Sequence, residues 1–301
     1  MKIHTALLSF GMSGKIFHAP FLSTNPNFTL VGALERTKKE IEKIYPNTYS
    51  YSSFDEICND PNIELVVVNT PNYTHFEYAK KLLLANKNIV VEKCFTNNLA
   101  EAIELKNIAI QQNKMIAIYH NRRYDSDFLT IQKCLSEKMI TKIFRVEMRF
   151  EKYKMGLNIK KHKEEVNEGS GILKDLGPHI IDQAIILFGL PNRVFASFKK
   201  NRIYSLVDDD DFIILFYLQF EVHIYLSLVN QEILPAYKII GQNGVLYKMR
   251  SDNQEQNLMD RLLPNSPKWK YDVHDALLIE RKDNFEKIKH YRNLTGNYGV
   301  F

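Results

Sequence analysis

Short apolar runs recur through the first 120 residues of this chain at intervals of about 25–30 residues. Stretches with helical periodicity separate these runs. The run Ile63–Asn69 (IELVVVN) is almost continuous and rich in β-branched side chains, which is typical of a parallel strand buried on both faces. This alternation of strand and helix predicts a doubly wound α/β sheet. The predicted strands are Ile3–Phe10, Phe28–Leu34, Ile63–Asn69, Asn88–Val91 and Met115–Tyr119.

A glycine-containing turn, SFGMSG at Ser9–Gly14, lies between the first apolar run and a helical stretch. Strand, glycine turn and helix form the context in which the G-x-G-x-x-G fingerprint binds a dinucleotide. Ser9 stands where the first glycine is expected, and its Cβ atom predicts a strained or slightly displaced turn. Gly11 still lets the backbone approach a pyrophosphate, and Gly14 still permits close packing of helix on strand. We expect cofactor contacts from Phe10, Gly11, Met12, Ser13 and Gly14.

An acidic residue follows the second apolar run at the distance that a dinucleotide site requires. Glu35 lies 21 residues after Gly14, and an acid at about 20 residues beyond the fingerprint binds the adenosine ribose of NAD. Arg36 comes next and could instead contact the 2′-phosphate of NADP. Both cofactors therefore stay open, and a solvated helix start is the plain alternative for Lys38 and Lys39.

Two further turns follow strands at the sheet edge where open α/β folds bind ligands. TPNYTH at Thr70–His75 follows the third run, and Glu92, Lys93 and Cys94 follow the fourth. A lysine in the place of Lys93 is a surface residue in most folds, but at the carboxyl end of a parallel strand it points into the ligand crevice. We expect further cofactor contacts from Thr70, Pro71, Asn72, His75 and Glu92.

The second half of the chain has a different pattern. Lys142–Glu151 alternates in polarity like an exposed strand. A helix is expected from Pro178 to Phe188, since proline suits a first helical position and Gly189 follows the last. Short linkers join several of the remaining strands, which is typical of an antiparallel sheet. These strands are expected at Arg193–Lys199, Phe212–Phe220, Val222–Leu228, Ala236–Ile240 and Val245–Met249.

Asp175 and His179 stand four residues apart in the segment Gly169–Gln183, GSGILKDLGPHIIDQ. If a helix starts near Pro178, His179 lies in its first turn and Asp175 lies in the turn that precedes the helix. A carboxylate in that place can hold one imidazole nitrogen while the other nitrogen faces a substrate. The alternative is structural, with Asp175 as a helix cap and His179 as a packed side chain.

Composition and charge exclude several functional classes. The 301 residues carry a net charge of +5 without a basic run interleaved with aromatics, so nucleic acid is not an expected partner. Cys58, Cys94 and Cys134 fit no zinc, redox or disulfide pattern. No apolar run approaches the ~20 residues that span a bilayer and no cleavage site follows the N-terminal patch, so we expect a cytoplasmic protein. The acidic run Asp208–Asp211 is interpreted as a solvated turn and not as a metal site.

Seven motifs, in order along nearly the whole chain, resemble one known family. They are FGMSGKIFHAPF at Phe10–Phe21, TPNYTH at Thr70–His75, VEKCF at Val91–Phe95, YHNRRYDSDFLT at Tyr119–Thr130, GSGILKDLGPHIIDQ at Gly169–Gln183, LFGLP at Leu187–Pro191 and GNYGVF at Gly296–Phe301. On these motifs the sequence resembles the Gfo/Idh/MocA family of NAD(P)-dependent oxidoreductases. Within that family it resembles the inositol dehydrogenase-like branch, which includes NADP-dependent scyllo-inositol dehydrogenases. The resemblance implies a Rossmann domain at residues 1–121 and a substrate-binding and oligomerisation α/β domain with an open, mostly antiparallel sheet at residues 122–301.

The resemblance also implies roles for individual residues. Lys93 matches the lysine of the family's E-K-P motif, and Asp175 and His179 match the acid and the histidine of a second signature. Oxidation of a secondary alcohol removes a proton as well as a hydride, so we expect His179 to act as the general base, Asp175 to orient it and Lys93 to hydrogen-bond the reacting oxygen. Nicotinamide carries the hydride chemistry, so no metal is required. On the substrate side we expect His120, Asn121, Arg123, Tyr153 and Lys163.

Several positions depart from the family pattern. Ser9 replaces a glycine, and Cys94 replaces the proline of E-K-P, which leaves the aim of the lysine less constrained. Lys152 and Lys154 stand where arginines are usual, and lysine cannot reproduce the planar bidentate fork of arginine. His162, Lys163 and Glu164 stand where this branch usually has Trp-Arg-Glu.

From these observations we predict a cytoplasmic NAD(P)-dependent oxidoreductase that acts on a polyol, an inositol or a sugar-like substrate. NADP is the preferred cofactor because of Arg36 and the branch resembled. The alternative function is a degenerate, non-catalytic NAD(P)-binding protein of the same fold, which the departures motivate. Relatives self-associate through the broad sheet, so a homo-oligomer is expected. The family's chain continues beyond GNY, whereas this one stops at Phe301, so we expect the second domain to lack the final C-terminal helices.

Overall fold

The computed structural model describes residues 2–158, 164–282 and 285–301. Its internal contacts divide the chain into two compact units. The first unit comprises the residues up to His120, the segment Glu255–Lys270 and Phe301, and the second comprises Asn121–Gln254 and Tyr271–Val300. The sequence predicts one boundary near residue 121 and does not anticipate that residues 255–270 belong with the first unit.

The first unit is built on a six-stranded sheet whose strands are all parallel. The spatial order β3-β2-β1-β4-β5-β6 is that of a Rossmann fold, and the order reverses between β1 and β4. All four residues of β4 are buried, as expected for a β-branched strand covered on both faces. The strands are β1 (Ile3–Leu7), β2 (Phe28–Leu34), β3 (Tyr49–Tyr51), β4 (Leu65–Val68), β5 (Asn88–Val91) and β6 (Ile116–Ile118).

Helices cover both faces of this sheet. One apolar core packs strand residues against α3, α4 and α5, and a smaller one packs them against α1 and α2. Side-chain caps start two of these helices, because Ser53 accepts the amide hydrogen of Glu56 and Asn98 that of Glu101. The helices and turns are the π-helical turn η1 (Gly14–His18), α1 (Ala19–Thr24), α2 (Glu40–Ile44), α3 (Phe54–Asn59), the 3₁₀ turn η2 (Asn72–Thr74), α4 (His75–Leu84) and α5 (Leu99–Gln111).

The second unit is built on an eight-stranded, mostly antiparallel sheet in the order β14-β13-β12-β11-β7-β10-β9-β8. β7 and β10 form a parallel pair in this sheet, with Val146 opposite Val222 and Met148 opposite Ile224. The predicted α/β class, with a parallel Rossmann sheet and an antiparallel second sheet, is therefore confirmed. The strands are β7 (Ile143–Glu151), β8 (Arg193–Lys199), β9 (Asp210–Phe216), β10 (Glu221–Ser227), β11 (Tyr237–Gly241), β12 (Gly244–Lys248), β13 (Ala276–Lys282) and β14 (Phe285–Tyr291).

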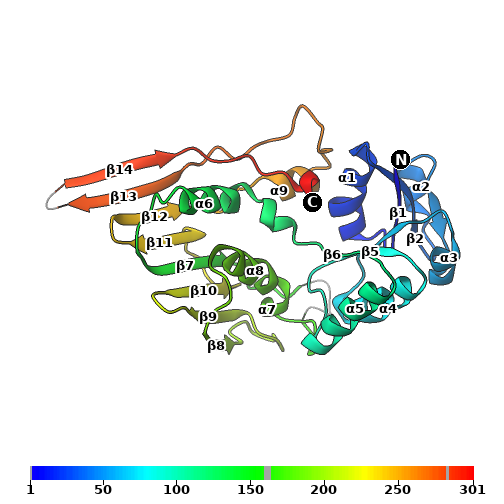
Figure 1. Ribbon diagram of the computed structural model, residues 1–301, viewed down its shortest axis with the longest axis horizontal. Coiled ribbons are helices and arrows are strands. Elements are labelled where there is room, and N and C mark those ends of the chain that lie inside the picture. The colour runs from blue at the N-terminus through cyan, green and yellow to red at the C-terminus, as the bar shows by residue number, and fades with distance from the viewer. Residues whose placement is uncertain (1, 159–163, 283–284) are drawn as a thin grey trace. The chain divides into compact units, whose positions relative to one another are not determined.

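Three helices pack on one face of the second sheet and close its apolar core (Figure 1). Alternate residues of β7, among them Val146 and Met148, face this core with no exposed area, whereas Arg145 and Arg149 lie on the opposite face. The helices and turns of this part are η3 (Asn121–Tyr124), α6 (Ser126–Ser136), α7 (Ile172–Asp175), α8 (Gly177–Phe188) and η5 (Tyr298–Val300), and α9 spans Gln254–Met259.

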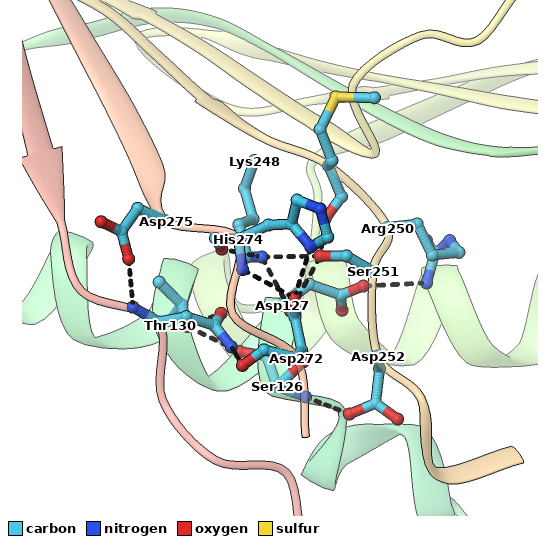
Figure 2. A network of polar contacts seen from close by, with 12 residues as sticks. Ser126, Asp127, Thr130, Lys248, Arg250, Ser251, Asp252, Asp272, His274 and Asp275 are labelled. Carbon is cyan, nitrogen blue, oxygen red and sulfur yellow. Dashed lines mark hydrogen bonds and ion pairs between the residues drawn. The ribbon is translucent and has the colours of Figure 1, made fainter. Parts of the chain in front are cut away.

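A buried polar network joins segments of the second unit that are far apart in the sequence (Figure 2). The Lys248 ammonium lies 3.0 Å from Asp272 Oδ2, and both side chains have no exposed area. Lys248 also donates to Ser251 Oγ at 2.9 Å and to the His274 carbonyl at 2.6 Å, so its three donors are satisfied. Ser126, at the start of α6, donates to the same Asp272 oxygen at 2.9 Å. The network therefore fixes α6 to the end of β12.

The acidic run Asp208–Asp211 is not a solvated turn, so that prediction was wrong. Asp209 has no exposed area and accepts hydrogen bonds from Arg202 Nε at 3.1 Å and from the Asn201 amide. Arg202 is itself buried, so it requires a buried counter-charge. Asp211 is 3% exposed, and burial together with the charge of Asp208 raises its pKa to about 8.

In the described part of the chain, no helix combines the length and the apolar composition that crossing a bilayer requires.

Candidate active site

The glycine turn of the first unit is shaped by Gly14 and Ser9. A Cβ atom at Gly14 would lie 2.2 Å from the Ser9 carbonyl oxygen, so only glycine lets the helix start this close to the strand end. The Ser9 hydroxyl accepts a hydrogen bond of 3.1 Å from the Gly11 amide. Ser9 does not adopt the left-handed conformation that favours glycine. The serine that replaces the first glycine therefore braces the turn without strain at its own backbone.

The side chains of the remaining turn residues differ in exposure and in contacts. Phe10 is 5% exposed and packs edge-on against Tyr45, so a cofactor contact at this position falls to its backbone. The Met12 side chain is exposed. Ser13 Oγ donates a hydrogen bond of 2.6 Å to Glu92 Oε1, which joins the glycine turn to the end of β5.

Asn69, which the sequence predicts inside a strand, contacts the glycine turn. It follows β4 directly, is 6% exposed, and its Nδ2 donates to the Ser9 carbonyl oxygen at 2.8 Å. This bond ties the glycine turn to the strand that precedes TPNYTH. The signal in the sequence was a polar amide that ends an otherwise apolar run, since such a residue needs a partner when it is buried.

His75 braces two turns and does not offer a ring nitrogen to a ligand. It is 1% exposed, with Nδ1 2.7 Å from the Cys94 carbonyl oxygen and Nε2 2.9 Å from the Thr70 carbonyl oxygen. The TPNYTH turn is closed further by Thr74 Oγ1, which donates to the Pro71 carbonyl at 2.6 Å. His75 therefore supports both turns, and its expected contact with the cofactor stays a prediction.

Lys93 lies between Glu92 and Cys94, directly after β5, and is half-buried. The peptide bond between Lys93 and Cys94 is cis. Glu92 Oε1 lies 2.8 Å from His18 Nε2 and also accepts the hydrogen bond of Ser13. Burial would raise the pKa of Glu92, but the hydrogen bond and charge of His18, then Ser13 and the Lys93 ammonium, outweigh it and hold this pKa below its ordinary value. Glu92 is therefore a carboxylate next to the lysine.

Glu35 uses its carboxylate as a helix cap. Oε1 accepts the amide hydrogen of Glu40 at 3.0 Å, and Oε2 accepts that of Ile41 at 2.9 Å. Oε2 also accepts the Ser50 hydroxyl at 3.1 Å. An acid at a helix N-terminus is stabilised by the backbone amides and the helix dipole. The neighbouring Arg36 is exposed.

In the second unit, Asp175 and His179 stand on either side of a break between two helices. Asp175 is the last residue of α7 and half-buried, so the expected turn before the helix is itself a short helix. α8 begins at Gly177 with Pro178 in its first turn and ends at Phe188, as predicted. His179 is 6% exposed, and its amide donates to the Leu176 carbonyl at 3.2 Å.

The expected substrate-side residues have different surroundings. Arg123 forms a bidentate ion pair with Asp182 of α8, with Nε 2.8 Å from Oδ2 and Nη2 2.6 Å from Oδ1, so its planar fork is already engaged. Asn121 is 7% exposed, and His120 is half-buried. Tyr153 is exposed and forms an isolated bridge with Val229. Lys163 lies outside the described residues.

Family models match most of the chain. The oxidoreductase family with an NAD-binding Rossmann fold, Gfo/Idh/MocA, matches residues 3–120, and the C-terminal domain of the same family matches residues 128–247. The chain belongs to the Gfo/Idh/MocA family. The predicted family, its Rossmann domain and its character as an NAD(P)-dependent oxidoreductase are thereby confirmed.

Relatives within Gfo/Idh/MocA align over almost the whole chain. The scyllo-inositol 2-dehydrogenase (NADP(+)) IolW of Bacillus subtilis is 32% identical over 98% of this chain and 83% of its own length. The uncharacterized oxidoreductase YdgJ of Escherichia coli is 32% identical over 100% of this chain and 86% of its own length. The crystal structure of an oxidoreductase from Bacillus cereus superposes with a TM-score of 0.90 at 28% identity, over 100% of this chain and 87% of that one.

No group of three histidine, cysteine, aspartate or glutamate side chains within residues 2–158, 164–282 and 285–301 is placed to hold a metal ion. The polar groups of the glycine turn, the TPNYTH turn and the Lys93 turn instead connect with one another through hydrogen bonds of Ser13, Asn69 and His75. These turns follow β1, β4 and β5, neighbours across the point where the strand order reverses, which is where open α/β sheets bind ligands.

Proposed function

We propose that this chain transfers hydride between the nicotinamide of NADP and a secondary hydroxyl or carbonyl group of a polyol, an inositol or a sugar-like substrate. The observation that carries the proposal is the 2.6 Å hydrogen bond from Ser13 Oγ to Glu92 Oε1. Because Lys93 follows Glu92 directly, this bond holds a lysine-bearing turn beside the glycine turn of the same unit. An amine in that place is suited to a reaction at a bound nicotinamide.

The residues of the glycine turn fit a dinucleotide. The close approach of helix and strand at Gly14 leaves no room for a Cβ atom, and η1 has no acidic residue in its first turn. Backbone amides near a helix start favour phosphate when no acid competes for them. When bound, nicotinamide supplies the hydride acceptor or donor.

The side chains supply the proton chemistry. In the direction of oxidation, His179 takes the hydroxyl proton as the hydride leaves, and in reduction it returns that proton to the new alkoxide oxygen. Asp175 orients the imidazole. The Lys93 ammonium donates a hydrogen bond to the reacting oxygen and stabilises the negative charge that develops there.

Two observations support NADP over NAD. Glu35 already accepts three hydrogen bonds, from Glu40, Ile41 and Ser50, so at most about one of its lone-pair sites is left for a ribose hydroxyl. The exposed Arg36 beside it suits a 2′-phosphate. The NADP(+) dependence in the name of IolW is consistent with this choice.

The substrate class rests on the relatives and on the chemistry of the side chains. IolW is named for scyllo-inositol, a ring of secondary hydroxyl groups. Exposed Lys152, Tyr153 and Lys154 follow β7 and offer hydrogen-bond donors to hydroxyl groups without a requirement for a charged substrate.

We also propose that the chain forms a homo-oligomer through the face of the second sheet that lies opposite its helices. That face carries alternating charged side chains on β7, where Arg149 pairs with Glu147 at 2.7 Å and lies 3.9 Å above the ring of Tyr225. Sedimentation velocity should find a dimer or a larger assembly, and a monomer at all concentrations would contradict the proposal.

Steady-state kinetics with a panel of inositols, polyols and sugars tests the main proposal. NADP(H)-dependent turnover of at least one member is expected, with weaker or no turnover when NAD(H) is supplied. A parallel NADPH fluorescence titration identifies the alternative function. Binding without turnover across the panel would favour a non-catalytic nucleotide-binding protein, and the absence of binding would exclude both functions.

A further inference from the structure

His18 is a buried histidine of the first unit that none of the expected roles includes. It is the last residue of η1 and is 5% exposed. Its Nε2 lies 2.8 Å from Glu92 Oε1, the same oxygen that accepts the hydroxyl of Ser13. The glycine turn thus reaches the end of β5 through two side chains, one at each end of η1.

The charge of Glu92 decides how this contact works. Its pKa is held below the ordinary value despite burial, with His18 the largest of the groups that lower it. A carboxylate only accepts hydrogen bonds, so His18 Nε2 carries the hydrogen and donates it. Hydrogen bonds to a charged group are stronger than those between neutral groups. Without His18, the buried carboxylate would lose its main donor.

A second aromatic residue limits the movement of the His18 ring. Tyr119 is 5% exposed, and its ring centroid lies 4.4 Å from that of His18. The Tyr119 hydroxyl donates to the Phe17 carbonyl at 2.9 Å, and the Tyr119 amide donates to the Val91 carbonyl at 2.8 Å. Burial, and after it the charge of Glu92, raise the Tyr119 pKa well above its ordinary value, so this hydroxyl stays a donor.

The turn that carries Lys93 is therefore held on both sides. Glu92 before it is bound by His18 and Ser13, and the Cys94 carbonyl after it faces Nδ1 of His75. A lysine side chain is a flexible stem of four carbons, so its ammonium reaches a defined point only if its backbone is fixed.

We propose that His18 is a positioning residue: through the carboxylate of Glu92, it fixes the glycine turn and the turn that carries Lys93 as one body. The role of Lys93 in this inference rests on the proposed function. The contacts that hold the Lys93 turn do not depend on that function. It predicts that cofactor binding and the environment of Lys93 change together when His18 loses its donor.

The test compares His18→Leu with His18→Gln. Glutamine keeps an N–H donor at a similar reach, whereas leucine keeps the bulk without the donor. An NADPH fluorescence titration should give a dissociation constant raised about tenfold in His18→Leu, corresponding to about 1.4 kcal/mol, and within about threefold of the wild type in His18→Gln. The rate at which an amine-modifying reagent labels Lys93, followed by peptide mass spectrometry, should shift in His18→Leu and recover in His18→Gln.

His4→Leu is the matched control, since His4 is a half-exposed histidine on β1 of the same unit. It should change neither readout. A merely structural role for His18 predicts that the leucine and glutamine variants give the same Lys93 labelling rate and the same dissociation constant, whether or not these match the wild type. That result would overturn the inference.

If His18→Leu does not fold, a double-mutant cycle replaces it. His18→Phe, which keeps an aromatic ring but has no donor, and Glu92→Gln are combined, and the double variant should bind NADPH no more weakly than Glu92→Gln alone, because both changes act through one contact. Additive losses would overturn the inference. The Lys93 labelling experiment needs no substrate and no turnover, so a failure of the proposed function is seen separately in the steady-state panel.

Discussion

Ser13 and Glu92 are 79 residues apart in the sequence, yet the serine hydroxyl lies 2.6 Å from the glutamate carboxylate. The first belongs to the glycine turn after β1, and the second begins the turn after β5. Their contact means that the glycine turn and the residue before Lys93 form one hydrogen-bonded unit. The chemistry proposed for this protein depends on that juxtaposition.

Lys93→Met should remove catalysis without removing the cofactor. The methionine keeps most of the side-chain length but cannot hydrogen-bond the reacting oxygen. We expect kcat to fall by about 10²–10⁴-fold, and the NADPH dissociation constant to change by less than about threefold. Steady-state kinetics measure kcat, and a fluorescence titration measures the NADPH dissociation constant. Lys81→Met, at an exposed position of α4, is the control and should leave both unchanged. A Lys93→Met variant with the wild-type kcat would exclude the role given to this amine.

Arg36→Ala should weaken NADPH and leave NADH almost unaffected. If the guanidinium holds the 2′-phosphate, its loss removes a charge-assisted contact that only NADPH can make, and the NADPH dissociation constant should rise by about tenfold or more. Lys43→Ala, at an exposed lysine of α2, is the control for a general loss of positive charge. Equal losses for both cofactors would show that Arg36 does not read the phosphate.

Lys248→Met should destabilise the second unit strongly. It leaves the Asp272 carboxylate buried without its cation, and breaking one partner of a buried pair costs about 3–5 kcal/mol. Lys289→Met is the matched control, since Lys289 pairs with Glu280 at 2.7 Å on the surface, where such pairs contribute little to stability. Urea unfolding measures both. Similar losses in the two variants would contradict the importance given to the buried pair.

Asp125 should make the folded protein less stable as the pH rises from about 4 to about 7. Burial, with the charges of Asp127 and Asp252 adding to it, raises the Asp125 pKa to about 7 from an ordinary 3.8. Between these values the unfolded chain releases a proton that the folded chain keeps, so unfolding becomes more favourable as pH rises and levels off above about 7. Asp125 thus lowers the free energy of unfolding, and the full reduction is reached at pH values above its folded pKa.

Asp125→Asn should flatten this slope, because asparagine cannot ionise and its oxygen still accepts the 2.5 Å hydrogen bond from Tyr298. We expect the difference in the free energy of unfolding between pH 5 and pH 8 to shrink by about 1–4 kcal/mol. Asp55→Asn, at an exposed acid of α3, should leave the slope as it is. An unchanged slope in Asp125→Asn would contradict the assignment.

Much of the fold could be predicted because its elements carry strong local patterns. The apolar runs of the Rossmann sheet and the Pro178 helix were located closely, since buried strands and capped helices are visible in the sequence. β3, β13 and β14 were missed. Most residues of β14 are exposed, and it stands at the end of the described sheet beside β13, so its apolar alternation is weak. Such a strand is defined by its partner and not by its own residues.

The positions of these turns were also predictable, whereas the partners of their side chains were not. Position after a parallel strand predicted the turns at Ser9, Thr70 and Lys93. Glu35 as a helix cap and His75 as a support of two turns depend on backbone groups whose position the sequence does not reveal. The same is true of His18, whose partner is 74 residues away.

Transfer of deuterium from the nicotinamide tests the central claim most directly. The enzyme is supplied with NADPH that carries deuterium at C4 of the nicotinamide ring, together with keto-inositols and sugar ketones, and the alcohol products are analysed by mass spectrometry. If hydride passes directly between nicotinamide and the substrate carbon, a product alcohol should carry the label on that carbon. If NADPH binds but no product gains deuterium from either face of the ring, the chain does not perform the proposed reaction.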